Sequence, residues 1–214
     1  MRKEFGLAAL ALLATSCSLN GGLPAASLMM RDAALASGSI RSAHVALVTD
    51  GAVPGLPVQR LEADITTENG GGAAGSIAPV LGAPIDFAQV RDALYTKTSS
   101  GAFTRSTTRV LDATNLLDPH HGLAHLLADI QHPTTIARQR RLGIDSFEVT
   151  GGLPAADIAH LLPGATTAAT ITTWLRVEQT HIPVDTTLTF PSDGSTLDIK
   201  VSDIDKKMTI TTPE

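Results

Sequence analysis

The sequence is poor in three features that usually help to classify a protein. It contains a single cysteine, so no disulfide can form within the chain. Aromatic residues make up 3 % of its 214 residues, which leaves few large rings to fill an interior. Its longest apolar run, residues 5–14, is far shorter than the roughly 20 residues of a membrane-spanning helix. A disulfide-rich scaffold is therefore excluded, and so is a spanning helix at this run.

Basic residues are also in deficit. The chain has 16 Lys and Arg against 21 Asp and Glu, a formal net charge of −5. This balance argues against nucleic acid, and against an anionic membrane surface, as an electrostatic partner.

An assembled catalytic motif is missing as well. The sequence has no Gly-x-Ser-x-Gly elbow, and neither Ser76 nor Ser195 has a local base that would activate it. Glu62 and Asp64 share one face of a predicted strand, where alternation makes them solvent-facing charges rather than a catalytic pair. We therefore expect the protein not to be an enzyme.

The lone cysteine, Cys17, follows a basic start (residues 1–3), the apolar run and the small residues 14–16. This arrangement resembles a bacterial lipoprotein signal. The resemblance implies that the Cys17 thiol takes a diacylglyceryl group, that the bond after Ser16 is cut, and that the new amine is acylated. The anchor would then be stable, since stable membrane anchoring needs more than one acyl chain. An ordinary cleaved signal with an incidental cysteine is the alternative.

The predicted organisation follows from this start. Residues 1–16 form a signal peptide, residues 17–24 an acylated cysteine with a short tether, and residues 25–214 a single domain. Helices are expected at 25–37, 112–117, 118–130 and 154–162. Strands are expected at 43–48, 61–66, 77–80, 85–91, 93–98, 146–150, 171–177, 184–190, 197–201 and 208–210. The fold class is α+β, with an antiparallel sheet that a few helices cover on one side.

A metal site needs consideration because the chain has seven histidines. His121 and His125 are four residues apart on the predicted helix 118–130, a spacing that zinc sites use. They lie opposite Leu123, Leu127 and Ile130, and the spacing supplies no third ligand. A solvated polar face is favoured, and we expect no metal site.

Several segments, in order, resemble the LppX/LprA/LprF/LprG family of mycobacterial and related cell-envelope lipoproteins. They are Ser42-Ala43-His44-Val45, Val53-Pro54-Gly55-Leu56, Asp64-Ile65-Thr66-Thr67, Ala93-Leu94-Tyr95, Leu116-Leu117-Asp118-Pro119, Gly122-Leu123-Ala124 and Thr172-Thr173-Trp174-Leu175. The resemblance covers nearly the whole chain after the tether. It implies a half-barrel, a strongly curved antiparallel sheet with helices on the concave side that enclose an apolar cavity for multi-acyl lipids.

The expected cavity lining comes from the apolar faces of strands and of one helix. Its candidates are Ile77, Leu61, Ala63, Ile65, Phe147, Val149, Leu175, Leu188, Leu123 and Leu127. Ile77 is the most specific prediction among these, because Gly75-Ser76-Ile77 resembles a family strand whose apolar side chain faces the cavity. An ordinary solid core is the competing interpretation, since alternation shows which residues face inward but not what they touch.

The resemblance implies a lipoprotein that binds and transfers or displays multi-acyl lipids or glycolipids. Its lipid anchor would hold it at the outer face of the cytoplasmic membrane, with a lipid transporter as a possible partner. No cofactor is expected beyond the covalent lipid on Cys17 and a non-covalent acyl lipid ligand. The alternative is a surface interaction lipoprotein with a collapsed cavity that acts through protein or receptor contacts.

Overall fold

The computed structural model describes residues 22–213, apart from 99, 108–111 and 179. The predicted signal peptide, Cys17 and the tether up to residue 21 lie outside the described residues. The end of the tether is described. There the carbonyl oxygen of Pro24 accepts a hydrogen bond from the Thr135 hydroxyl at 2.8 Å, which places the start of the domain against the sheet.

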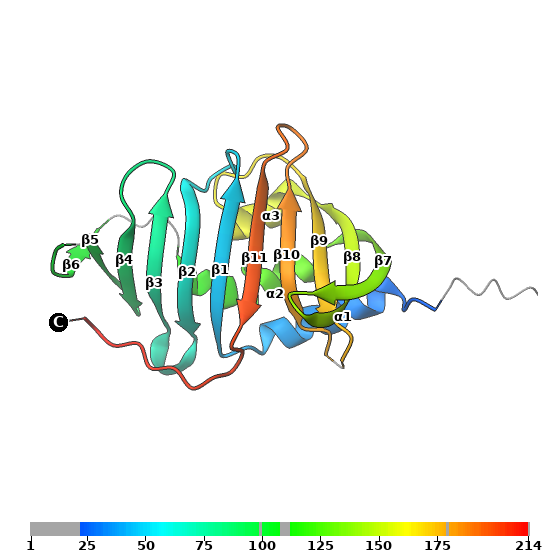
Figure 1. The fold of residues 1–214 in the computed structure, drawn as a ribbon, viewed down its shortest axis with the longest axis horizontal. Helices are drawn as coiled ribbons and strands as arrows, with labels where there is room; N and C mark the ends of the chain where they lie inside the picture. Colours follow the sequence, from blue (N-terminus) through cyan, green and yellow to red (C-terminus); the bar gives the residue numbers. More distant parts are fainter. Residues whose placement is uncertain (1–21, 99, 108–111, 179, 214) are drawn as a thin grey trace, which may run out of the picture.

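Eleven strands form one antiparallel sheet (Figure 1). They are β1 (Ser42–Asp50), β2 (Val58–Thr66), β3 (Gly72–Pro79), β4 (Ile85–Val90), β5 (Ala93–Thr98), β6 (Thr104–Ser106), β7 (Gln131–Arg141), β8 (Ile144–Leu153), β9 (Ala169–Arg176), β10 (Pro183–Thr189) and β11 (Thr196–Ser202). The strand order is β6-β5-β4-β3-β2-β1-β11-β10-β9-β8-β7, so β6 and β7 are the two edges and the sheet stays open. The predicted α+β class is confirmed.

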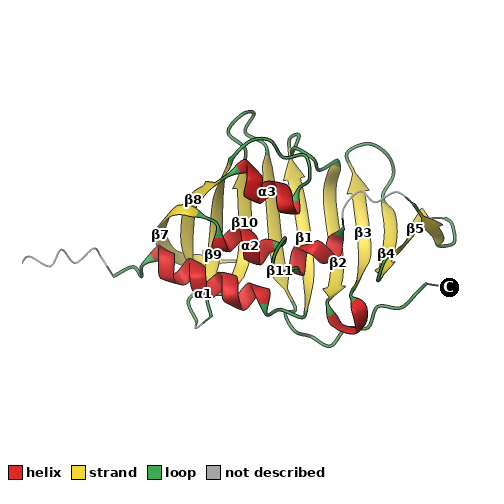
Figure 2. Cartoon of the chain, turned by 180° about the vertical axis from the view of Figure 1, so that it is seen from behind, coloured by secondary structure: helices red, strands yellow, loops and turns green. Residues whose placement is uncertain are grey.

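The helices gather on one face of this sheet (Figure 2). They are α1 (Ala26–Gly38), α2 (Leu123–Ala128), α3 (Ala155–Leu161) and the short 3₁₀ helix η2 (Ala113–Leu117). A further 3₁₀ helix, η1 (Glu68–Gly70), lies in the connection from β2 to β3. Alternation along the strands directs apolar side chains toward the helices. Across four neighbouring strands the register aligns Leu47, Leu61, Ile77 and Ile85, which belong to one apolar cluster. No helix in the described part of the chain is long and apolar enough to cross a bilayer.

The third predicted helix is shorter than expected. It was placed at 118–130, but α2 begins at Leu123, with Gly122 as its N-cap, and ends at Ala128. The Asp118 carboxylate instead accepts the amides of His120 and His121 at 2.7 and 3.0 Å, which makes a separate turn before the helix. The prediction that His121 stands one helical turn before His125 is therefore wrong.

The chain after β11 also differs from its prediction. A strand was expected at 208–210, but this segment has no strand pairing and runs across the ends of the neighbouring strands (Figure 1). It is held at the start of β1, where the Arg41 amide donates to the Asp205 carboxylate at 2.8 Å and the Ser42 hydroxyl donates to the Lys206 carbonyl at 2.6 Å. These contacts hold the tail at the ends of the strands, and the tail does not pair with an edge strand of the sheet.

Two strands approach each other closely at Gly75 on β3. A Cβ added at this position would lie 1.9 Å from the carbonyl oxygen of Glu62 and 2.7 Å from the Cα of Ala63, both on β2. No side chain fits within such distances of a neighbouring backbone. Gly75 is therefore required by packing, which explains a glycine inside a strand that pairs on both sides.

The outer face of the sheet carries one ion pair with a buried member. Asp185 on β10 is 1 % exposed and alternates with Thr186, which faces the helices. Two guanidinium nitrogens of Arg141, on the edge strand β7, lie 2.6 Å from the Asp185 carboxylate. The Arg141 guanidinium also stacks on the Trp174 ring, 4.0 Å from its centre. The pair links the edge strand to β10 across two intervening strands.

Candidate functional site

The ten residues predicted to line a cavity come together between the sheet and the helices. All of them belong to one apolar cluster or pack against it. Nine are buried, and Phe147 is half-buried. The ten predicted residues thus lie in one interior, where their side chains pack in or against the same apolar cluster. Whether this interior admits a ligand remains a prediction of the family resemblance.

An apolar pocket opens at one end of this interior. Its volume is about 730 Å³, within the range of small-molecule sites. It lies between the loop that joins β1 to β2 and the loop that joins β3 to β4. The lining residues are Gly51, Ala52, Val53, Gly55, Leu56, Pro57, Pro79, Val80 and Leu81. Not one of these side chains is charged, so the pocket suits a hydrocarbon rather than a polar ligand.

The pocket joins the interior at its floor and meets solvent at its rim. Val53 and Leu56 are buried and belong to the same apolar cluster as Leu61 and Ile77. At the rim, Val80 is 56 % exposed and Leu81 is 88 % exposed. Large apolar side chains that are exposed beside an apolar pocket mark a contact surface for a ligand or a membrane.

The sequence analysis predicted no pocket at these two loops, and it placed Val80 in the expected strand 77–80. A signal for the pocket is nevertheless present, because residues 51–58 and residues 70–85 contain no charged side chain. Turns on a protein surface are normally polar, so two uncharged loops are unusual. Neither loop was connected with the other, because only the folded sheet brings the two turns to the same end.

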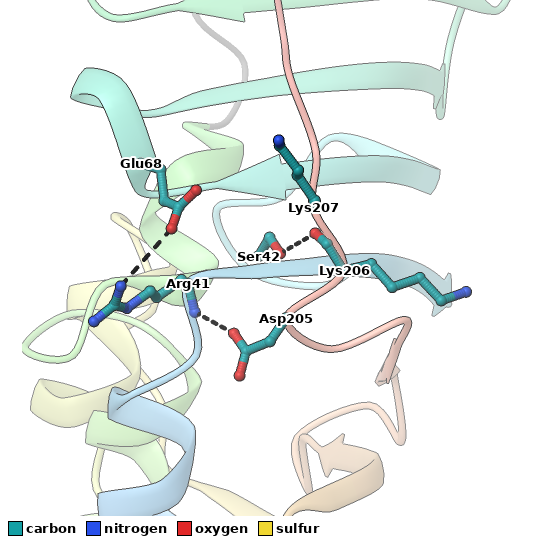
Figure 3. A pocket seen from close by; sticks show the side chains of 6 residues that line it. All are labelled: Arg41, Ser42, Glu68, Asp205, Lys206 and Lys207. Atoms are coloured by element: carbon teal, nitrogen blue, oxygen red, sulfur yellow. Dashed lines mark hydrogen bonds and ion pairs between the residues drawn. The ribbon is translucent and has the colours of Figure 1, made fainter.

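The opposite end of β1 carries a polar pocket of about 290 Å³ (Figure 3). Arg41, Ser42, Glu68, Asp205, Lys206 and Lys207 line it. The Arg41 guanidinium lies 3.8 Å from the Glu68 carboxylate, and Arg41 and Ser42 hydrogen-bond to Asp205 and Lys206 of the C-terminal tail. Its polar groups are thus used to hold the tail, and the two ends of the sheet differ sharply in polarity.

The candidate carboxylate pair on β2 lies on the outer face, as predicted. Glu62 pairs with Arg60 at 3.1 Å, and Asp64 pairs with the His44 ring at 2.8 Å. The side chains of Glu62 and Asp64 are 45 % and 56 % exposed, and each has its own partner. The prediction that they are solvent-facing charges is confirmed.

The histidines of the α2 region have neighbours that the sequence did not indicate. The ring centre of His160, on α3, lies 4.7 Å from that of His125 and 5.7 Å from that of His121. Burial raises the pKa of the Asp118 carboxyl, but hydrogen bonds from the His120 and His121 amides and from the His121 ring outweigh it, so the pKa is lowered overall. Asp118 therefore stays ionised beside His121.

Comparison with known proteins places the chain among lipoproteins. The family model of the LppX_LprAFG lipoproteins matches residues 25–210. The lipoarabinomannan carrier protein LprG of Mycobacteroides abscessus is 28 % identical, over 100 % of this chain and 99 % of that protein. Lipoprotein LprA of Mycobacterium tuberculosis is 28 % identical, over 88 % of this chain and 81 % of that protein.

Two crystal structures share the fold. LprF from Mycobacterium bovis superposes with a TM-score of 0.78 at 23 % identity, over 88 % of this chain and 96 % of that one. LppX from Mycobacterium tuberculosis has a TM-score of 0.70 at 20 % identity, over 88 % and 99 % of the two chains. With the family model matching nearly all the described residues and the same open sheet in these relatives, the chain belongs to the LppX_LprAFG family of lipoproteins.

Proposed function

We propose that this protein is a membrane-anchored carrier that binds multi-acyl lipids or glycolipids and transfers or displays them without changing them chemically. Cys17 carries the anchor, the protein acts at the outer face of the cytoplasmic membrane, and a lipid transporter supplies or receives the ligand. Membership in the family and the carrier names of its LprG relatives support this role. No enzymatic step is part of the proposal.

The observation that carries the proposal is the uncharged pocket, whose buried residues Val53 and Leu56 belong to the apolar cluster of the interior. An acyl chain that enters over Leu81 meets only apolar side chains on its way to Val53 and Leu56. Beyond them lie the predicted cavity residues Leu61 and Ile77. Burial of hydrocarbon contributes about 25 cal/mol per Å², which is enough to drive uptake of a long chain when the interior side chains separate to admit it.

Leu81→Asp places a charge at the rim of the pocket and is expected to weaken acyl-lipid binding at least tenfold. The reason is the loss of about 1.5–3 kcal/mol of apolar contact when a leucine no longer packs on the ligand. Fluorescent fatty-acid titration of a form that begins at Ser18 measures the effect. Leu142→Asp is the matched control, because Leu142 is 57 % exposed in the β7–β8 turn, outside the pocket. Equal affinities for both variants would exclude this pocket as the entrance.

Ile77→Trp tests the interior. Ile77 lies between Leu61 and Ile85 in the sheet, so a tryptophan there occupies the space into which a chain would extend. We expect the variant to copurify with much less lipid, at a cost of about 1–3 kcal/mol in stability from overpacking. Organic extraction followed by mass spectrometry measures the lipid per chain. If the folded variant retains as much lipid as the parent, Ile77 does not line the binding site.

A second candidate function has one observation in its favour. The ten predicted cavity residues pack within one apolar cluster, as a solid core would. On this reading the protein is a surface interaction lipoprotein that acts through protein or receptor contacts. A form that begins at Ser18 discriminates the two, because a carrier yields extractable long-chain lipid or takes up added lipid, whereas an interaction protein does neither.

A further inference from the structure

Helices α2 and α3 lie on the same face of the sheet (Figure 2) and contact each other. They bring possible metal ligands together. A ring nitrogen of His125 and carboxylate oxygens of Asp129 and Asp157 all lie within 4.8 Å of one another. His125 is on α2 and Asp129 is its C-cap, whereas Asp157 is on α3. All three are only partly exposed. Their spacing depends on how α2 packs on α3 and has no signature in the sequence.

His125 is oriented as metal-binding histidines are. Its Nδ1 lies 2.9 Å from the Asp129 carboxylate, which favours the tautomer with a proton on Nδ1 and a free lone pair on Nε2. That Nε2 atom is buried and has no hydrogen-bond partner within the described part of the protein. A buried nitrogen lone pair without a partner is unfavourable, and a bound cation would satisfy it.

The ring of His160 lies near those of His125 and His121, and both His160 and His121 are outside the group of atoms within 4.8 Å of one another. With Zn–N bonds of about 2.1 Å, two imidazoles on one tetrahedral zinc have ring centres roughly 5 Å apart. The ring centre of His160 lies 4.7 Å from that of His125 and 5.7 Å from that of His121. His121 is oriented in the same way as His125, with its Nδ1 3.0 Å from the Asp118 carboxylate.

The geometry points to a zinc site between α2 and α3, in which His125 and Asp157 bind the ion and the exposed rings of His160 and His121 turn toward it to complete the coordination. Asp129 and Asp118 orient the two histidines of the α2 segment. Imidazole and carboxylate ligands suit zinc and similar divalent transition metals, and do not suit magnesium or calcium, which prefer oxygen alone. The bound ion joins two helices that cover the sheet, and so stabilises that cover independently of any lipid.

The test uses the full chain, purified in detergent and freed of metal with a chelator. Titration with zinc chloride is expected to show one ion per chain and, at about a hundredfold excess over Kd, to raise the melting temperature by roughly 5–10 °C. Cobalt(II) in place of zinc is expected to give the intense visible absorption of a tetrahedral site. Failure to bind one ion saturably, or a cobalt spectrum typical of an octahedral aqua ion, would overturn the assignment.

Variants identify the ligands. His125→Gln, His160→Gln and Asp157→Asn are each expected to reduce zinc affinity more than tenfold, and Asp129→Asn about 10- to 100-fold because it orients a ligand. His44→Gln is the matched control, since His44 and Asp64 form a 2.8 Å pair on the outer face. His160 is exposed, so His160→Gln leaves the packing of α3 intact. Unchanged affinity in the folded His160→Gln protein, or an equal loss in His44→Gln, would contradict the site.

Discussion

Replacement of Arg141 by alanine is expected to lower the free energy of unfolding by about 3–5 kcal/mol, because it leaves a buried carboxylate without its cation. Asp185 is 1 % exposed, and Arg141 supplies both nitrogens that contact its Oδ2 atom. Its Oδ1 atom has no hydrogen-bond partner among the described residues, so the Arg141 guanidinium is the group that compensates the charge there. The alanine variant also uncovers the face of Trp174. Urea unfolding monitored by circular dichroism measures the change.

Arg138→Ala is the control for this loss. Arg138 lies on the same edge strand and pairs with Asp145 at 3.5 Å, but both side chains are 58 % exposed. Exposed pairs contribute about 0–1 kcal/mol. The double replacement of Arg141 by Met and Asp185 by Leu is expected to recover most of the lost stability, since apolar residues often replace a buried ion pair without cost. Equal losses for Arg141→Ala and Arg138→Ala would show that the buried charge is compensated elsewhere.

Gly75→Ala is expected to destabilise the sheet by about 3 kcal/mol, the upper part of the usual range for overpacking. The added methyl group would lie 1.9 Å from the Glu62 carbonyl oxygen, so β2 and β3 must separate to accept it. These strands carry Leu61 and Ile77, and their separation disturbs the interior beside the apolar pocket. Thermal unfolding measures the loss, with a fall in melting temperature of roughly 6–12 °C.

Gly152→Ala is the matched glycine replacement within a strand. A Cβ at Gly152 meets nothing closer than the Cβ of Gln131 at 4.0 Å, which is an ordinary contact. Because alanine restricts the unfolded chain, this change is expected to be neutral or to stabilise by about 0.4–1 kcal/mol. If Gly75→Ala is tolerated as well as Gly152→Ala, β2 and β3 do not approach as closely as described.

Much of the fold follows from two-residue alternation in the sequence. The alternation of Ala43, Val45 and Leu47 with the positions 44, 46 and 48 correctly predicted β1 and the face it buries. The ordered family segments added the architecture, which alternation alone does not specify. Each inward residue was identified from the pattern of its own strand or helix. The ten candidates lie in one interior even though they come from distant parts of the chain.

The failures have physical causes that can be located. Strand β7 was missed because the second half of its sequence is rich in arginine and because it contains Pro133. Such residues protect an edge strand, but they remove the alternation that identifies a buried strand. The predicted strand at 208–210 has suitable side chains, but the positions beside β1 are already taken by β2 and β11. Strand pairing depends on the whole sheet and not on local pattern.

The candidate sites were predictable to different degrees. The inward apolar residues follow from local alternation, whereas the apolar pocket requires two loops to meet, and the histidine cluster requires α2 to pack on α3. His160 is 35 residues after His125, a separation without any meaning as a ligand spacing. Contacts between elements that are distant in the chain are the part that a single sequence does not disclose.

Native mass spectrometry of a form that begins at Ser18, after incubation with vesicles that contain long-chain multi-acyl lipids, tests the carrier role most directly. The account predicts a folded protein with a stoichiometric lipid adduct, which Leu81→Asp reduces and Leu142→Asp does not. A folded protein that shows only its own mass, before and after incubation, would contradict the proposal that this protein carries lipids.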